Sequence, residues 1–241
     1  MDDADRFAEL RHQTRELLHY ALEKVRDGRK GAGTSLDTRF QVAEYLVGEA
    51  REYLDGAWEL LLAGKPSASL TLSRWLLEAA LNLLWVVSER AEIDARLASL
   101  RGNALRLAAL QHEGMAELVP SQASARRALA KKARRLRDED GADSLKPLAH
   151  RVDEAMESLG DDAPRVYALF RLCSAAAHSS LEPPAPDAPD ARSQYVEDIA
   201  VWMPAATTLY LVAGVYSLVG VGEAEALKRW WADEISPLLP S

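Results

Sequence analysis

The chain has few of the residues that most often build metal or redox sites. It contains one cysteine, Cys173, so no disulfide can form within it, which is typical of a reducing cytoplasm. Its five histidines are scattered, and neither a Cys/His cluster nor an HExxH motif occurs. The glycine-rich segment 28–35 lacks the GKS or GKT of a phosphate-binding loop, and there is no GxSxG motif. We therefore expect no metal and no other cofactor.

An excess of positive charge is also missing. The chain has 29 lysines and arginines against 37 aspartates and glutamates, a net charge of -8, which excludes a generic binder of polyanions. Its first ten residues are acidic and polar, unlike a secretory signal. The uncharged run 199–219 is long enough to cross a bilayer, but its polar residues and acidic flanks favour a buried helix. We expect a cytoplasmic protein that does not associate with membranes.

Sustained two-residue alternation, the pattern of a β-strand, is absent, whereas helical spacing of apolar residues recurs along the chain. The sequence therefore predicts an all-α protein, with a single domain of eight or nine helices over residues 1–241. The expected helices are 4–27, 38–63, 67–88, 93–118, 121–140, 144–159, 162–180, 193–219 and 223–235.

Three of these helices, near 67–88, 163–180 and 193–219, are the least polar and are expected to form the apolar core. The N-terminal helix and the glycine-rich loop, residues 1–36, are expected at the periphery. The proline-rich acidic segment 182–191 is expected to be a loop, because proline disfavours both helix interiors and central strands.

A narrow polar stripe interrupts the apolar segment 166–180. Its members are Tyr167, Arg171, Ser174 and His178, which fall within roughly 60° of one helix face. An arginine can bind a phosphate, and a histidine titrates near neutral pH. The pair would suit phosphodiester transfer, with His178 as general acid or base and Arg171 stabilising negative charge. A buried structural network, with Arg171 paired to a carboxylate, is the alternative interpretation.

The helix near 67–88 carries a second polar stripe, formed by Arg74, Glu78 and Asn82. If this helix packs against the segment 166–180, Glu78 is the natural carboxylate for Arg171 or His178, because neither charge could be buried cheaply alone. We therefore hypothesise that the two stripes face each other and form one cluster.

The helix 121–140 is strongly basic. Between Ser121 and Arg137 it has seven positive charges and no acidic residue, and the rest of the chain then has a net charge of -15. Such a helix can hold a nucleic-acid backbone. The candidate contacts are Arg126, Arg127, Lys131, Lys132, Arg134 and Arg135. Docking on the acidic helix 38–63, in this chain or in a partner, and a plain solvated face remain open. No aromatic residue interleaves with the charges, which argues against base stacking.

Residues 171–178, RLCSAAAH, have the form Arg, six residues, His. This resembles the defining motif of the HEPN superfamily (higher eukaryotes and prokaryotes nucleotide-binding), whose members are all-helical. Many of them are metal-independent ribonucleases of toxin and defence systems that act as dimers. The resemblance implies that Arg171 and His178 are the catalytic pair.

A wider pattern, over about residues 40–220, is similar to an uncharacterised bacterial all-helical family with a domain of unknown function. In that family an Arg…Glu helix, which Arg74 and Glu78 match, precedes a Tyr…Ser…His helix. Tyr167, Ser174 and His178 match the second helix, and this likeness implies no known activity.

The resemblance to HEPN proteins implies an RNA-acting protein, with metal-independent endoribonuclease activity of a toxin or defence type. Its partners would be RNA, a second copy in a homodimer and an antitoxin-type protein. Whether the chain is an enzyme stays open. One alternative is a non-catalytic helical interaction module whose stripes are structural. Another is a small-ligand pocket among Trp75, Trp85, Arg74 and Arg171.

Overall fold

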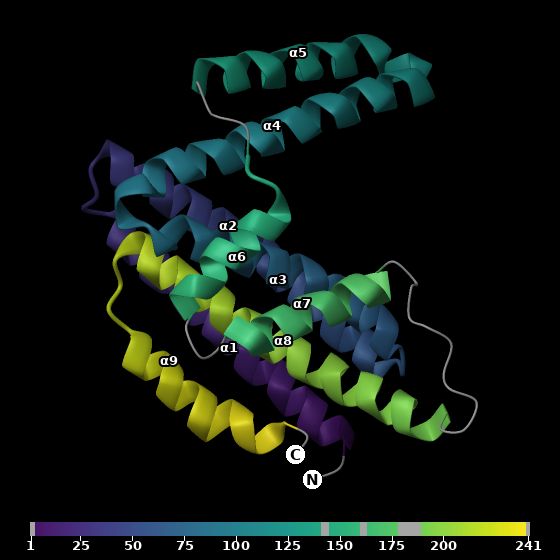
Figure 1. Ribbon diagram of the computed structural model, residues 1–241. Coiled ribbons are helices and arrows are strands. Elements are labelled where there is room, and N and C mark those ends of the chain that lie inside the picture. The colour runs from purple at the N-terminus through teal and green to yellow at the C-terminus, as the bar shows by residue number, and fades with distance from the viewer. Residues whose placement is uncertain (1–2, 141–144, 160–162, 178–188, 240–241) are drawn as a thin grey trace. The chain divides into compact units, whose positions relative to one another are not determined.

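The computed structural model describes residues 3–140, 145–159, 163–177 and 189–239. Over these ranges it contains nine α-helices and no strand, which confirms the predicted all-α class (Figure 1). The helices are α1 (Asp3–Arg29), α2 (Thr34–Leu62), α3 (Pro66–Ser88), α4 (Ile93–Leu118), α5 (Ala123–Asp140), α6 (Leu148–Leu159), α7 (Ala163–Ala177), α8 (Pro189–Val219) and α9 (Ala224–Trp230). A π turn, Trp231–Ile235, and a 3-10 turn, Ser236–Leu238, follow α9, where the sequence predicts one continuous helix.

The chain divides into two compact units. The first comprises residues 1–88 and 152–241, and the second comprises residues 89–151. Helices α4 and α5 form the second unit, in which they run side by side as an antiparallel pair (Figure 1). The single domain over residues 1–241 stays a prediction.

Helices α3 and α8 form the centre of the first unit. They pack against each other, and α3 also contacts α2 and α7. They approach closely at Gly214 of α8, where an added Cβ would lie 2.9 Å from the Cβ of Leu83. A larger residue at this position would force the two helices apart. The contacts of α3 with α7 and α8 confirm the predicted core of the three least polar helices.

The position of α1 and the start of α8 differ from the sequence-based expectation. Helix α1 packs against α2 and α8 and buries Leu10 and Leu18, so it belongs to the core of the first unit and not to its periphery. Helix α8 begins at Pro189, inside the segment 182–191 that was expected to be a loop. Proline is tolerated in a first helical turn, because its missing N–H would have no partner there. Residues 182–188 lie outside the described ranges.

Two helices are long and apolar enough to cross a membrane by length and composition, over Pro66–Ser88 and Val196–Val219. Most of each apolar window is buried inside the protein, at 61% and 72% respectively. Core helices of soluble proteins pass the same test, so length and composition alone are weak evidence for a span.

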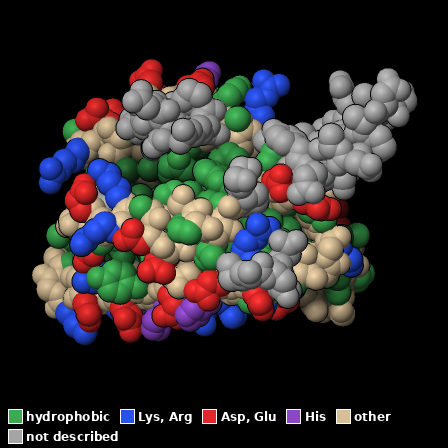
Figure 2. Space-filling model, turned by 90° about the horizontal axis from the view of Figure 1, so that it is seen from below, with side chains coloured by type: hydrophobic (Ala, Val, Ile, Leu, Met, Phe, Trp, Pro, Cys, Tyr) green, Lys and Arg blue, Asp and Glu red, His purple; other side chains and the backbone are tan. Residues whose placement is uncertain are grey.

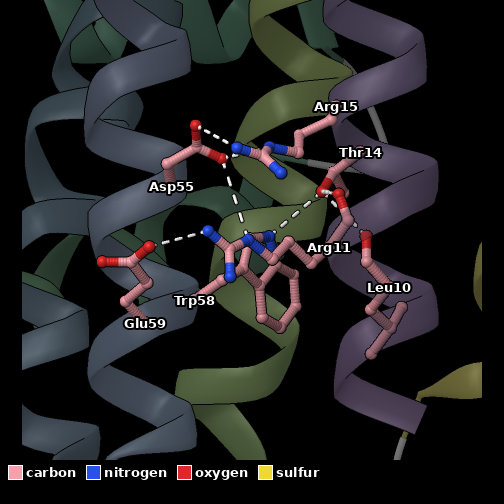
Figure 3. A network of polar contacts seen from close by, with 7 residues as sticks. All are labelled: Leu10, Arg11, Thr14, Arg15, Asp55, Trp58 and Glu59. Atoms are coloured by element: carbon pink, nitrogen blue, oxygen red, sulfur yellow. Dashed lines mark hydrogen bonds and ion pairs between the residues drawn. The ribbon is translucent and has the colours of Figure 1, made fainter. Parts of the chain in front are cut away.

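Arginines of α1 bind carboxylates of α2 at the surface of the first unit (Figure 3). A terminal nitrogen of Arg11 lies 2.8 Å from Oε1 of Glu59, and a terminal nitrogen of Arg15 donates to Oδ2 of Asp55 at 2.8 Å. Nearer the N-terminus of α2, Arg26 Nε donates to Glu44 Oε1 at 2.8 Å. On the face drawn in Figure 2, acidic and basic side chains lie interspersed in the same way.

Below these ion pairs, a buried hydrogen bond joins α1 to α2. Nε1 of Trp58 donates to Oγ1 of Thr14 at 3.0 Å, and the Thr14 hydroxyl donates to the Leu10 carbonyl oxygen at 2.8 Å (Figure 3). Trp58 and Thr14 are both completely buried. The indole N–H therefore depends on Thr14 for its hydrogen bond.

We expect Thr14→Val to lower the free energy of unfolding by about 1–3 kcal/mol, because it leaves the buried Trp58 N–H without an acceptor. Thr14→Ser is the matched control, since it keeps the hydroxyl and removes one methyl group, at a cost of about 1 kcal/mol. Urea denaturation followed by tryptophan fluorescence measures both. Equal losses for the two variants would show that the hydrogen bond contributes little.

Candidate functional site

Helix α7 carries the predicted polar stripe on its outer side. The helix buries Val166, Leu169 and Cys173, whereas Arg171 is exposed and Tyr167 is 43% exposed. At 3.6 residues per turn, the stripe lies about 130° from the centre of the buried face. The helix is thus amphipathic, and its polar stripe does not lie at the contact with α3.

Arg171 is exposed, so a ligand could bind its guanidinium group. Its guanidinium carbon lies 6.0 Å from the centre of the Tyr167 ring, at the outer limit of a cation–π contact. In the part of the chain that the structure describes, no hydrogen bond or ion pair joins Arg171 to Glu78. The predicted cluster of two stripes is therefore not formed by these two residues. His178 lies outside the described residues.

Ser174 and the stripe of α3 are less accessible. Ser174 is half-buried, and among the described residues its Oγ atom is buried without a hydrogen-bond partner. Arg74, Glu78 and Asn82 are all half-buried, and Arg74 and Asn82 each take part in a polar or electrostatic interaction. The charge of Arg74 acts on Cys173, so this end of the α3 stripe lies near α7.

The only cysteine is buried beneath the α7 stripe. Burial raises the pKa of the Cys173 thiol to about 12, and the charge of Arg74 lowers it in part. The thiolate is the nucleophile in cysteine chemistry. Cys173 is thus a packing residue of the contact between α7 and α3.

We expect Cys173 to react with a thiol reagent such as DTNB at least about 100-fold more slowly in the native protein than in urea, because almost none of it is thiolate at about pH 8. A Leu62→Cys variant, which replaces a leucine that is 46% exposed, is the control and should react quickly in the native state. Comparable native and unfolded rates for Cys173 would contradict its burial.

The two tryptophans of the suggested ligand pocket take part in packing. Trp75 stacks on Tyr53 of α2, with ring centres 4.2 Å apart and planes 4° apart. Trp85 is 2% exposed, and its Nε1 donates to Oε2 of Glu154 at 2.7 Å. A ligand between these rings would have to replace existing contacts. Across the described residues, no three His, Cys, Asp or Glu side chains gather as a metal site.

Helix α5 has a continuous cationic face. Its buried residues are Ala130 and Ala133, and the opposite side points to solvent. Five exposed residues make up this cationic face, namely Arg127, Lys131, Lys132, Arg134 and Arg135. They fall within roughly 160° of the helix circumference, over about two turns. Arg126 lies outside this face, half-buried, with two of its nitrogens donating to Gln122 Oε1 at 3.2 and 3.1 Å.

Part of the cationic face is free to bind an anion. Arg134 pairs with Glu113 of α4, and Arg135 Nε lies 3.3 Å from Glu139 Oε1. Within the described ranges, Arg127, Lys131 and Lys132 make no ion pair. These three side chains hold the unpaired charge of the helix.

The acidic helix that was considered as a docking surface for α5 is largely occupied. Glu44, Asp55 and Glu59 of α2 bind arginines of α1, and Figure 3 shows the pairs of Asp55 and Glu59. The sequence shows the acidic face of α2 but not its partner. The regularly spaced arginines of α1, at positions 11, 15, 26 and 29, were the signal that could have identified α1 as this partner.

Charge is divided unevenly between the two units. Residues 89–151 have 13 basic and 9 acidic side chains, a net charge of +4. The remaining residues have 16 basic and 28 acidic side chains, a net charge of -12. The second unit is thus the electropositive part of an acidic protein.

No family model, curated protein or solved structure matches the chain.

Proposed function

We propose that this protein acts on RNA, binding it through the cationic face of α5 and cleaving it as a HEPN-like, metal-independent endoribonuclease. The observation that carries the proposal is the cationic face itself, because Arg127, Lys131 and Lys132 are exposed and make no ion pair in the described part of the chain. Unpaired lysines and arginines on one face are the groups that replace counterions along a phosphate backbone.

The placement of Arg171 supports the catalytic part of the proposal. An arginine buried against Glu78 would favour a structural network, whereas Arg171 is exposed on α7. In the proposed reaction, His178 takes the proton of a ribose 2′-hydroxyl, and the 2′-oxygen attacks the adjacent phosphorus. The bond from phosphorus to the 5′-oxygen breaks, and that oxygen takes up the proton carried by the protonated His178, which leaves a 2′,3′-cyclic phosphate and a 5′-hydroxyl. Arg171 stabilises the negative charge on the phosphate oxygens in the transition state.

Binding and cleavage of a labelled single-stranded RNA in EDTA test the two parts separately. We expect affinity to fall steeply between about 50 and 200 mM salt, with a slope of about -2 from three phosphate contacts. Cleavage should end in cyclic phosphate, detectable by mass. Absence of salt-dependent binding would contradict the RNA-binding role, and binding without cleavage would contradict the nuclease role alone.

A non-catalytic interaction module is the second candidate, and the exposed leucines of the second unit favour it. Leu107, Leu110 and Leu118 of α4 are 51%, 52% and 78% exposed. Under this alternative the protein binds a protein surface, and substitution of His178 changes stability but no RNA-directed activity.

A further inference from the structure

Helix α4 carries a row of uncharged residues that sequence analysis did not single out. From Leu100 to Leu118 the row follows steps of four, three, four, three and four residues. Its members, which we call the α4 seam, are Leu100, Ala104, Leu107, Gln111, Gly114 and Leu118. This is the heptad spacing of a helix that packs along another helix. Leu107 is 51% exposed and Leu118 is 78% exposed, so the seam has no cover along much of its length.

Helix α5 cannot be the partner of the α4 seam. Gly102, Ala109 and Ala116 of α4 are buried and lie seven residues apart, on the side of α4 almost opposite the seam. Ala130 and Ala133 of α5 are buried as well, and α4 and α5 pack along each other. Helix α5 thus occupies the small-residue side of α4 and leaves the seam exposed.

We propose that the α4 seam is an interface with a second copy of this chain, in which the two α4 helices pair antiparallel about a two-fold axis near Ala109. In that register every seam residue meets a seam residue of the other copy. Leu100 lies opposite Leu118, Ala104 opposite Gly114, and Leu107 opposite Gln111. Small residues oppose small ones, so the backbones can approach closely, and leucines meet at both ends. The same surface serves both copies, as two-fold symmetry requires.

The charges of α4 favour the antiparallel direction. Between Leu100 and Leu118 its first half carries Arg101 and Arg106, and its second half carries Glu117 and Glu113, of which Glu113 already pairs with Arg134 of α5. Antiparallel pairing places the basic half of one helix beside the acidic half of the other, whereas parallel pairing would place like charges together. The antiparallel pair also opposes the two helix dipoles. The self-complementary register and this charge distribution together favour a second copy in this orientation.

The interface is compatible with RNA binding but does not rest on it. Because α5 covers the other side of α4, the pair leaves both cationic faces exposed. A protein that dimerises through α4 but binds no RNA would overturn only the proposed function.

The first test is the mass of the full chain in solution. Sedimentation equilibrium should give twice the 26.5 kDa of one chain at micromolar concentration. Leu107→Glu places a charge at the centre of the seam, and we expect it to raise the dissociation constant of the dimer at least about 100-fold. Leu62→Glu, at a leucine of similar exposure in the first unit, should leave the dimer intact.

A second variant separates dimer loss from misfolding. An added Cβ at Gly114 meets no atom within 4 Å, and glutamate has a higher helix propensity than glycine. Gly114→Glu should therefore keep or raise the helical stability of the monomer, measured by circular dichroism, while it blocks the close approach of Ala104 of the second copy. A wild-type monomer, or a dimer that survives both Leu107→Glu and Gly114→Glu, would overturn the proposal.

Cross-linking tests the orientation. Mixed Leu107→Cys and Gln111→Cys proteins should form the disulfide between positions 107 and 111 faster than either protein links to itself. A parallel pair would instead favour the link between two copies of the Leu107→Cys protein, which is the result that contradicts antiparallel pairing. The native Cys173 is buried and gives little background.

Discussion

Replacing Arg127, Lys131 and Lys132 together with glutamine is expected to weaken RNA binding about 100-fold at about 50 mM salt. The three side chains are exposed, and in the described structure none of them makes an ion pair, so their charge is available to phosphates. Their removal also reduces the salt dependence, by about 2 in the logarithmic slope for a single strand. Glutamine has nearly the helix propensity of lysine and arginine, so α5 should persist. Fluorescence anisotropy with a labelled RNA, repeated over a salt series, measures both quantities.

A matched control removes the same charge elsewhere. Lys30, Lys65 and Lys228 are exposed lysines of the first unit, and their replacement with glutamine changes the net charge equally. We expect this control to change the affinity less than about threefold, because it leaves the local potential of α5 intact. Equal losses for the two triple variants would show that net charge, and not the cationic face, governs binding. No loss for either would contradict binding through α5.

Arg171→Ala and His178→Ala are each expected to slow RNA cleavage by about 1,000-fold, because a general base and a charge-stabilising group each contribute effects of about this size. Arg171 is exposed on α7, so its removal should leave the thermal midpoint nearly unchanged. Single-turnover cleavage of a 5′-labelled RNA in EDTA, analysed on a denaturing gel, gives the rate constants. RNA affinity should stay within about threefold, since the main binding surface would be α5.

Two further variants make the cleavage result specific. Arg171→Lys keeps the positive charge but loses the planar guanidinium, and we expect it to recover only part of the rate. Arg229→Ala removes another exposed arginine of the first unit and should cleave like the wild type. Equal cleavage by wild type and His178→Ala would point to a contaminating nuclease. A lack of cleavage by any of them would leave the interaction module as the better account of α7.

Local sequence signals predicted most helix positions, because they depend on backbone chemistry within a few residues. Helix α2 ends at Leu62, just before Gly64, which has a φ of 68°, and α8 ends at Val219, just before Gly220, which has a φ of 77°. Glycine adopts this left-handed conformation without a Cβ clash, so it ends helices efficiently. The absence of charge from residues 199–219 of α8 likewise predicted a central position.

The sequence did not predict that the polar stripe of α7 lies on the outer side of the helix. From residue 166 to 177, every residue outside the stripe is Ala, Leu, Phe, Val or Cys, so hydrophobicity alone did not show whether Val166 or Tyr167 faces the core. Packing on α3 buries Val166, Leu169 and Cys173 and leaves Arg171 exposed. The stripe therefore stays a candidate site, whereas the sequence was also compatible with a buried network.

Periodicity along the chain was thus enough to predict the all-α class, the central helices and the residues that share each helix face. It could not predict which face meets which, because that depends on contacts between residues far apart in sequence. The acidic face of α2 binds arginines of α1, and the basic face of α5 remains largely unpaired. Only tertiary packing decides this pairing, since opposite charges on any two helices would satisfy the same sequence pattern.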